Sequence, residues 1–253
     1  FLMHRYQMPI HLKLEHLQLT GSFKLRGATN AVAQLTDEQK KRGVVGVSTG
    51  NHGRGLAYAA SKAGIRVVIC MSQLVPHNKV DAIKDHGAEV RIVGQSQDEA
   101  QKEVDRLVAE EGMTMLPPFD HPHIIAGQGT IGLEILEDLP EVESVLVPLS
   151  GGGLISGVAL AMKSANPNIR IIGVSMERGA AMIESQRAGE PILVEELPSL
   201  ADSLGGGVGL DNQYTFEMVR DLVDDYVTLS EQEIAEAMRV AYFHEKQVVE
   251  GSG

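Results

Sequence analysis

The sequence predicts an α/β protein with two open, mostly parallel sheets and helices on both faces of each. Three observations predict this class. Short β-branched runs alternate with amphipathic segments, the amphipathic segments carry apolar residues at helical spacing, and glycine-rich loops follow several of the predicted strands. Parallel strands are joined by right-handed crossovers, so we expect the helices to cover both faces.

The predicted elements follow from these patterns. The segments predicted as strands are 10–14, 44–47, 67–71, 89–93, 145–149, 170–175 and 226–229. Helices are predicted around the apolar stripes 56/59/60/63, 100/104/107/108 and 234/237/238/241, and over 123–138. A further helix has Ser22 as its expected N-cap and a core-facing stripe at Leu25, Ala28, Val32 and Leu35.

Composition limits the classes of function. The chain has 253 residues and a net charge of −12 with no basic run, which argues against nucleic acid and anionic membranes as main partners. Its single cysteine, Cys70, ends an apolar run and is expected to be a buried thiol in a reducing, cytoplasmic compartment. The chain begins at Phe1, which is not an initiator residue, and stops at Gly253 in a loop-like stretch, so we expect the sequence to be a fragment. A domain boundary is expected near Pro117 and Pro118.

The stretch "GSFKLRGA" places Lys24 and Arg26 in the first turn of a predicted helix. The helix dipole disfavours cations at that end. Crowding by the dipole, the guanidinium and the Phe23 ring is expected to lower the pKa of Lys24, and a neutral lysine is a nucleophile. The alternative is a surface lysine that extends into solvent.

Two glycine loops follow predicted strands. In "STGNHGRG", from Ser48, backbone N–H groups at a helix start suit an anion and Asn51 adds a directional amide, although an ordinary strand-to-helix turn remains open. His52 is expected to support this turn. In "PLSGGGLISG", from Pro148, three successive glycines before a helix predict a phosphate cradle. A dinucleotide site that uses Glu177 for the ribose is the rival interpretation.

Other patterns carry less chemistry. A third loop, "ADSLGGGVGLDN", suits either a ligand wrap or a hinge. His121 and His123 predict a solvated turn rather than a metal site. No GxxxxGK stretch occurs, so a P-loop NTPase is not supported.

Taken in order, "GSFKLRGA", "STGNHG" and "SGGGL" resemble the fold-type II pyridoxal-5′-phosphate (PLP) enzymes, which have a tryptophan synthase β-like fold. The resemblance runs along the whole chain and is closest to the threonine/serine dehydratase and serine racemase branch. Within that branch, "LVPHNKVDAIKDHGAEVRIVG" and "PSLADSLGGGVGLDNQYTF" look most like the hydroxyectoine-utilisation dehydratases.

The resemblance implies roles for individual positions. Lys24 would form the Schiff base with the cofactor and act as the base at Cα, and Phe23 would line the ring pocket. Asn51 would bond the phenolic oxygen of the cofactor. The residues whose backbone would hold the phosphate are Gly151, Gly152, Gly153 and Leu154. Those that would frame the substrate carboxylate are Ser48, Thr49, Asn51 and His52.

The resemblance also implies a smaller domain at 46–121, a larger PLP-binding domain from 1–45 and 122–253 whose C-terminal part is missing, and a homodimer. The residue that faces the pyridine nitrogen would lie beyond Gly253. Thr49 stands where a racemase carries a serine acid, which allows a weak racemase activity or a structural threonine. A racemase-like metal site would be incomplete, because Ile183 stands where a second acid should accompany Glu177, so no metal is expected.

The expected reaction is β-elimination of water from a β-hydroxy amino acid, with hydroxyectoine degradation as the expected setting and a threonine/serine dehydratase or serine racemase as the alternative. Because the α-nitrogen of hydroxyectoine belongs to a cyclic amidine, we expect either ring opening first or an open hydroxy amino acid as the substrate. A nicotinamide-dependent oxidoreductase and an anion-binding module without activity are the alternatives from other classes.

Overall fold

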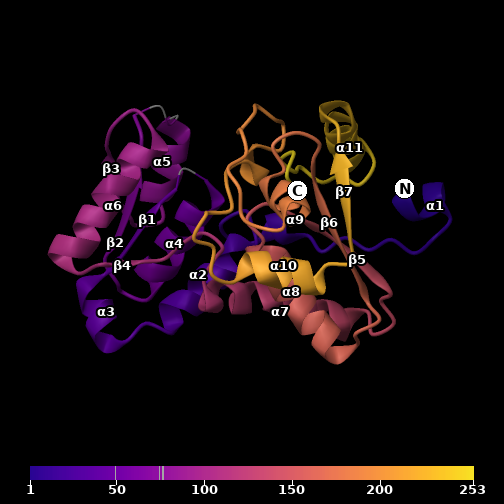
Figure 1. Cartoon of the computed structure of the whole chain (residues 1–253), viewed down its shortest axis with the longest axis horizontal. Helices are drawn as coiled ribbons and strands as arrows, with labels where there is room; N and C mark the ends of the chain where they lie inside the picture. The colour runs from indigo at the N-terminus through magenta and orange to yellow at the C-terminus, as the bar shows by residue number, and fades with distance from the viewer. Residues whose placement is uncertain (49, 74, 76) are drawn as a thin grey trace. The chain divides into compact units, whose positions relative to one another are not determined.

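The computed structural model describes residues 1–48, 50–73, 75 and 77–253 (Figure 1). The chain divides into two compact units, one formed by Phe1–His16 with Gly129–Gly253 and the other by Leu17–Gln128. The domain limits expected at 46 and 121 both fall inside the second unit, and that domain assignment stays a prediction.

The unit Leu17–Gln128 is built on a four-stranded parallel sheet with the order β3-β2-β1-β4. Its strands are β1 (Val44–Val47), β2 (Val67–Met71), β3 (Glu89–Ile92) and β4 (Thr114–Met115). The helices of this unit are α2 (Lys24–Ala33), α3 (Asp37–Arg42), α4 (Asn51–Lys62), α5 (His77–Lys84) and α6 (Gln97–Glu111).

Both faces of this sheet are buried, as a parallel sheet requires. One face packs its alternate residues, such as Val44 and Ile69, against α2, α4 and α5. The other face, with Val45 and Cys70, packs against α6. The expectation of a buried thiol is confirmed, because Cys70 is fully buried. This burial raises the pKa of the thiol to about 11.

The other unit holds a three-stranded parallel sheet in the order β5-β6-β7. Its strands are β5 (Ser144–Pro148), β6 (Arg170–Met176) and β7 (Asp225–Leu229). Its helical segments are α1 (Leu2–Tyr6), α8 (Gly153–Ala165), α9 (Ala181–Ala188), η2 (Asp202–Leu204), α10 (Thr215–Leu222) and α11 (Glu231–Phe243). Two further segments, η1 (Glu15–Leu17) and α7 (Pro122–Asp138), run across the division between the units.

Six predicted strands are confirmed to within one residue at each end, and the strand predicted at 10–14 is wrong. Residues 10–14, all of them described, have no regular secondary structure. A strand needs a paired neighbour, whereas this segment is held through a side chain: Lys13 Nζ lies 2.7 Å from Glu134 Oε2. Sequence patterning missed β4, whose two residues are too few to show a period.

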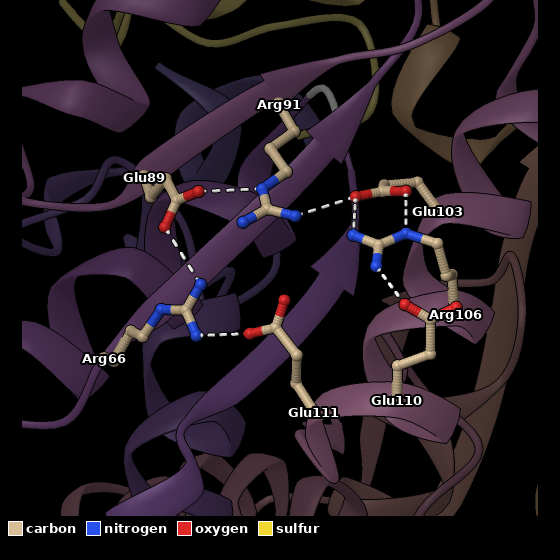
Figure 2. Close-up of polar contacts among 7 residues, drawn as sticks. All are labelled: Arg66, Glu89, Arg91, Glu103, Arg106, Glu110 and Glu111. Atoms are coloured by element: carbon tan, nitrogen blue, oxygen red, sulfur yellow. Dashed lines mark hydrogen bonds and ion pairs between the residues drawn. The ribbon is translucent and has the colours of Figure 1, made fainter.

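A network of ion pairs joins α6 to the edge of the four-stranded sheet (Figure 2). Arg91 on β3 lies 2.7 Å from Glu89 and 2.8 Å from Glu103, measured between nitrogen and oxygen. Arg106 also contacts Glu103 at 2.8 Å, while Arg66, just before β2, lies 2.6 Å from Glu111. The network therefore joins the middle and the C-terminal end of α6 to Arg66, just before β2, and to β3.

Candidate active site

Lys24 is the first residue of α2, and Phe23 is the N-cap. The predicted N-cap, Ser22, is wrong by one position, although its hydroxyl accepts a hydrogen bond from Lys24 N at 3.4 Å. The predicted apolar stripe of this helix is confirmed as buried. No acidic residue occupies the first turn, so nothing there offsets the helix dipole.

The amine of Lys24 has a defined partner. Lys24 Nζ donates to the carbonyl oxygen of Pro118 at 2.7 Å and lies 5.3 Å from the centre of the Phe23 ring. Burial lowers the pKa of Lys24 from 10.5 to about 8. The direction of the shift confirms the prediction, but its cause is desolvation rather than the neighbouring guanidinium.

The first turn of α2 is also held from α7. Gln128 is buried, and its Oε1 accepts a hydrogen bond from Gly27 N at 3.2 Å. The two helices approach so closely that a Cβ at Gly27 would lie 2.8 Å from the carbonyl oxygen of Ile124. Gln128 thus satisfies a backbone donor near the end of the helix that carries Lys24. Sequence reasoning missed it, because a glutamine inside a predicted helix carries no special signal.

Ser48 organises the loop between β1 and α4. Its Oγ accepts hydrogen bonds from Gly50 N at 3.3 Å and from Gly53 N at 2.9 Å. Gly53 leaves little room for a side chain, since a Cβ there would lie 3.0 Å from the Ser48 carbonyl oxygen. The predicted Thr49 position lies outside the described residues.

Asn51 and His52 open α4 next to this loop. Asn51 Oδ1 accepts a hydrogen bond from Arg54 at 2.5 Å. His52 is 4% exposed and its Nε2 donates to the carbonyl oxygen of Leu116 at 2.9 Å. Burial first, and the charge of Lys24 second, lower the pKa of His52 to about 4. His52 is therefore neutral near pH 7 and braces the segment that carries the Lys24 acceptor.

Helix α4 packs directly on the start of α2. A Cβ at Gly55 would lie 3.2 Å from the backbone of Lys24 and Leu25, so only glycine permits this approach without a shift. The structure thus brings Phe23, Lys24, Ser48, Asn51 and His52 together in one unit.

The triple-glycine bend lies in the other unit, between β5 and α8. Gly152 has φ of +90°, and a Cβ there would meet Thr215 Cβ and Met182 Cε, each at 3.0 Å. All three glycines are buried, and Leu154 is half-buried. Ser156 Oγ, in the first turn of α8, is buried and has no hydrogen-bond partner among the described residues. Backbone N–H groups at the start of a helix of 13 residues suit a phosphate.

These observations fit PLP. The cofactor needs an amine that can lose its proton and a cradle for its phosphate, and the chain has a desolvated lysine and a glycine bend that a Cβ would fill. Among the described residues, no cluster of three or more His, Cys, Asp or Glu side chains is placed to hold a metal. None of the described helices has the length and apolar character that a bilayer crossing needs.

Comparison with known proteins defines the class. The whole chain, residues 1–253, matches the family described as pyridoxal-phosphate dependent enzyme, and the chain belongs to this family. The family match sets aside the nicotinamide-dependent and inactive anion-binding alternatives. The α/β class, the fold type and the PLP cofactor predicted from sequence are confirmed.

Particular relatives narrow the class. The chain is 63% identical over 244 residues to a putative threonine dehydratase of Sinorhizobium fredii, covering 96% of this chain and 74% of the relative. It is 48% identical to L-threonine ammonia-lyase of Thermotoga maritima, and the match covers 96% of this chain and 60% of that relative. Thus the chain spans 74% of the length of the Sinorhizobium relative and 60% of the length of the Thermotoga relative.

Solved structures agree. Maize serine racemase gives a TM-score of 0.90 at 39% identity, with 94% of this chain and 71% of that chain covered. The processed form of threonine deaminase isoform 2 from Solanum lycopersicum gives a TM-score of 0.94 at 36% identity. That match covers 99% of this chain and 73% of the other chain. The chain is a threonine dehydratase-like, PLP-dependent lyase.

Proposed function

We propose that the chain dehydrates and deaminates an open-chain β-hydroxy amino acid such as threonine or serine, with Lys24 as the catalytic residue. The observation that carries the proposal is the Lys24 amine, desolvated to a pKa of about 8 at the start of α2 and held by the Pro118 carbonyl. The names of the relatives supply the substrate class.

The proposed cofactor contacts are those that the resemblance to the PLP enzymes implies. Backbone N–H groups of Gly151, Gly152, Gly153 and Leu154 would hold the phosphate, Phe23 would line the ring, and Asn51 would bond the phenolic oxygen. When bound, PLP supplies an electron sink for negative charge at the substrate Cα.

The chain's own groups then do the proton chemistry. Lys24 would be the residue that holds the cofactor, and its amine would also take the proton from the substrate Cα. Loss of the β-hydroxyl as water leaves an enamine, and its hydrolysis yields a 2-oxo acid and ammonia.

The substrate carboxylate would lie at the start of α4. Ser48, Thr49, Asn51 and His52 are the proposed frame, in which backbone N–H groups and the helix dipole attract the anion. The His52 ring is engaged by Leu116, so we assign it to support of the loop and not to proton transfer.

A role in hydroxyectoine degradation is the finer part of the proposal and is supported by the stretches 74–94 and 198–216 alone. Because the covalent route needs a primary amine, the ring-opened hydroxy amino acid would be the substrate in that setting. A cytoplasmic homodimer is proposed with it, and the dimer can be checked by light scattering of the full-length enzyme.

The test compares full-length wild type with Lys24→Ala and Lys24→Arg. Wild type should show a visible cofactor band that borohydride abolishes and should release ammonia from threonine or serine. Both variants should keep the far-UV circular dichroism of wild type and lose turnover by more than about a thousandfold. Wild-type turnover in Lys24→Ala would contradict the assignment. Turnover of hydroxyectoine with the ring intact would contradict the route through a primary amine.

A further inference from the structure

The side chain of Arg54 is directed at Asn51, one turn earlier on α4. Arg54 Nη2 donates to Asn51 Oδ1 at 2.5 Å, and both residues are half-buried. Arg54 also belongs to the helix itself, since its backbone N–H donates to the carbonyl oxygen of Gly50 at 3.2 Å. The contact is therefore a local one within the first turn of α4.

The chemistry of the two groups determines how the amide faces. A guanidinium has five N–H donors and no acceptor, so it can bond only the oxygen of an amide. If the Asn51 amide were rotated by 180°, its NH₂ group would face a second donor and the bond would be lost. Arg54 therefore holds Oδ1 towards itself and keeps the NH₂ donors on the opposite side of the Asn51 side chain.

Arg54 also lies against the turn that precedes Lys24. Its Nη1 is 3.9 Å from the position that a Cβ would take at Gly21, whose φ of +78° favours glycine. The guanidinium thus lies near the turn that leads into α2 as well as near the first turn of α4. Neighbours on two sides leave a long side chain fewer rotamers that keep its hydrogen bond.

We propose that Arg54 is a positioning residue that orients the Asn51 amide so that its NH₂ group donates to the phenolic oxygen of PLP. The inference rests on the proposed function, in which Asn51 contacts the cofactor. An acceptor on the cofactor needs a donor from the protein, and a positively charged partner on Oδ1 polarises the amide and strengthens its N–H donors.

The test measures PLP binding to the apo-protein of the full chain by the visible band, together with the pH midpoint of that band. Arg54→Met removes the donor and should weaken PLP binding by about tenfold, the size of one net hydrogen bond. Arg54→Gln keeps an N–H donor without the charge and should restore most of the affinity. Arg42→Met is the matched control, because Arg42 is an exposed arginine that pairs with Glu38 on α3.

Asn51→Ala and the double variant Asn51→Ala/Arg54→Met complete the cycle. If Arg54 acts through Asn51, the double variant should bind PLP with the same affinity as Asn51→Ala. The pH midpoint of the visible band should also shift in the same direction in Arg54→Met and in Asn51→Ala. Wild-type binding in Arg54→Met, additive losses in the double variant, or no recovery in Arg54→Gln would each overturn the inference. A wild-type chain that fails to bind PLP would instead overturn the proposed function. Unfolding midpoints of the apo-variants show whether the fold is intact.

Discussion

At the scale of the residue, burial makes the amine of Lys24 easier to deprotonate than that of an exposed lysine. An amine with its usual pKa of 10.5 is almost wholly protonated near neutrality and cannot attack an aldehyde. The desolvated amine, with a pKa of about 8, is neutral in about one molecule in ten at pH 7, far more often than an amine with the usual pKa. Its acceptor, the Pro118 carbonyl, keeps it directed without adding a negative charge that would raise the pKa again.

This shift gives a prediction about pH. Covalent attachment of PLP to Lys24 in the apo-protein, trapped with borohydride and followed by peptide mass spectrometry, should rise with a midpoint near pH 8. The folded pKa lies below the unfolded one, so this group's contribution to stability should also increase as pH rises from about 8 to 10.5. Exposed lysines in the same digest serve as internal controls. A midpoint above pH 10 for Lys24 would contradict the burial argument.

The sequence pointed to candidate residues for this site but not to their hydrogen-bond partners. Motif order identified Lys24, Asn51 and the glycine bend, because lysine and glycine are unusual where they occur. The acceptors Leu116 and Pro118 offer only backbone carbonyls, which have no residue-type signature. Only packing shows which carbonyl lies within reach of a side chain.

At the scale of the element, a side chain at Gly152 should destabilise the bend between β5 and α8. Gly152→Ala combines a left-handed backbone with contacts of 3.0 Å to Thr215 and Met182, and we expect a loss of about 1–3 kcal/mol in unfolding free energy with weaker PLP binding.

Gly189→Ala is the matched control for Gly152→Ala. Gly189 has a similar φ of +83° at the end of α9, and a Cβ there would meet nothing within 4 Å. Urea unfolding and PLP titration of both variants separate backbone strain from crowding. Equal losses in the two variants would show that crowding at the bend contributes nothing.

The sequence predicted a helix or strand correctly where the apolar residues of that element recur with a helical or strand spacing. The stripe of α2 and the buried run of β2 are visible in the chain, and the structure confirms both. The segment 10–14 alternates like a strand but finds no paired neighbour, and β4 is paired but too short to be recognised. Strand pairing depends on residues far apart in the sequence. The local sequence therefore could not show that 10–14 is unpaired or that β4 is paired.

At the scale of the whole molecule, folding should depend on acid and salt through the network of Figure 2. Hydrogen bonds from Arg106 and then Arg91 lower the pKa of Glu103 from 4.5 to about 2. The folded pKa is the lower one, so this stabilisation is present above about pH 4.5 and is lost as pH falls towards 2.

Glu103→Gln should therefore reduce the free energy of unfolding by about 1 kcal/mol at pH 7 and low salt. In about 1 M salt the difference should shrink, since screening then acts within about 3 Å. Glu236→Gln on α11, which removes a longer exposed pair with Arg239 at 3.5 Å, is the control and should change little. A loss for Glu103→Gln that is the same at low and high salt would contradict an electrostatic origin.

The sequence by itself determined the α/β class, six of the strands, the lysine at the start of α2 and the glycine bend, because period and residue type are local properties of the chain. The tertiary structure decided the rest. It alone shows that burial, not a neighbouring charge, lowers the pKa of Lys24, that Gln128 accepts a hydrogen bond from the helix carrying it, and that Arg54 donates to Asn51. These depend on which atoms exclude water and which donors meet acceptors, and only the packed chain brings those groups together.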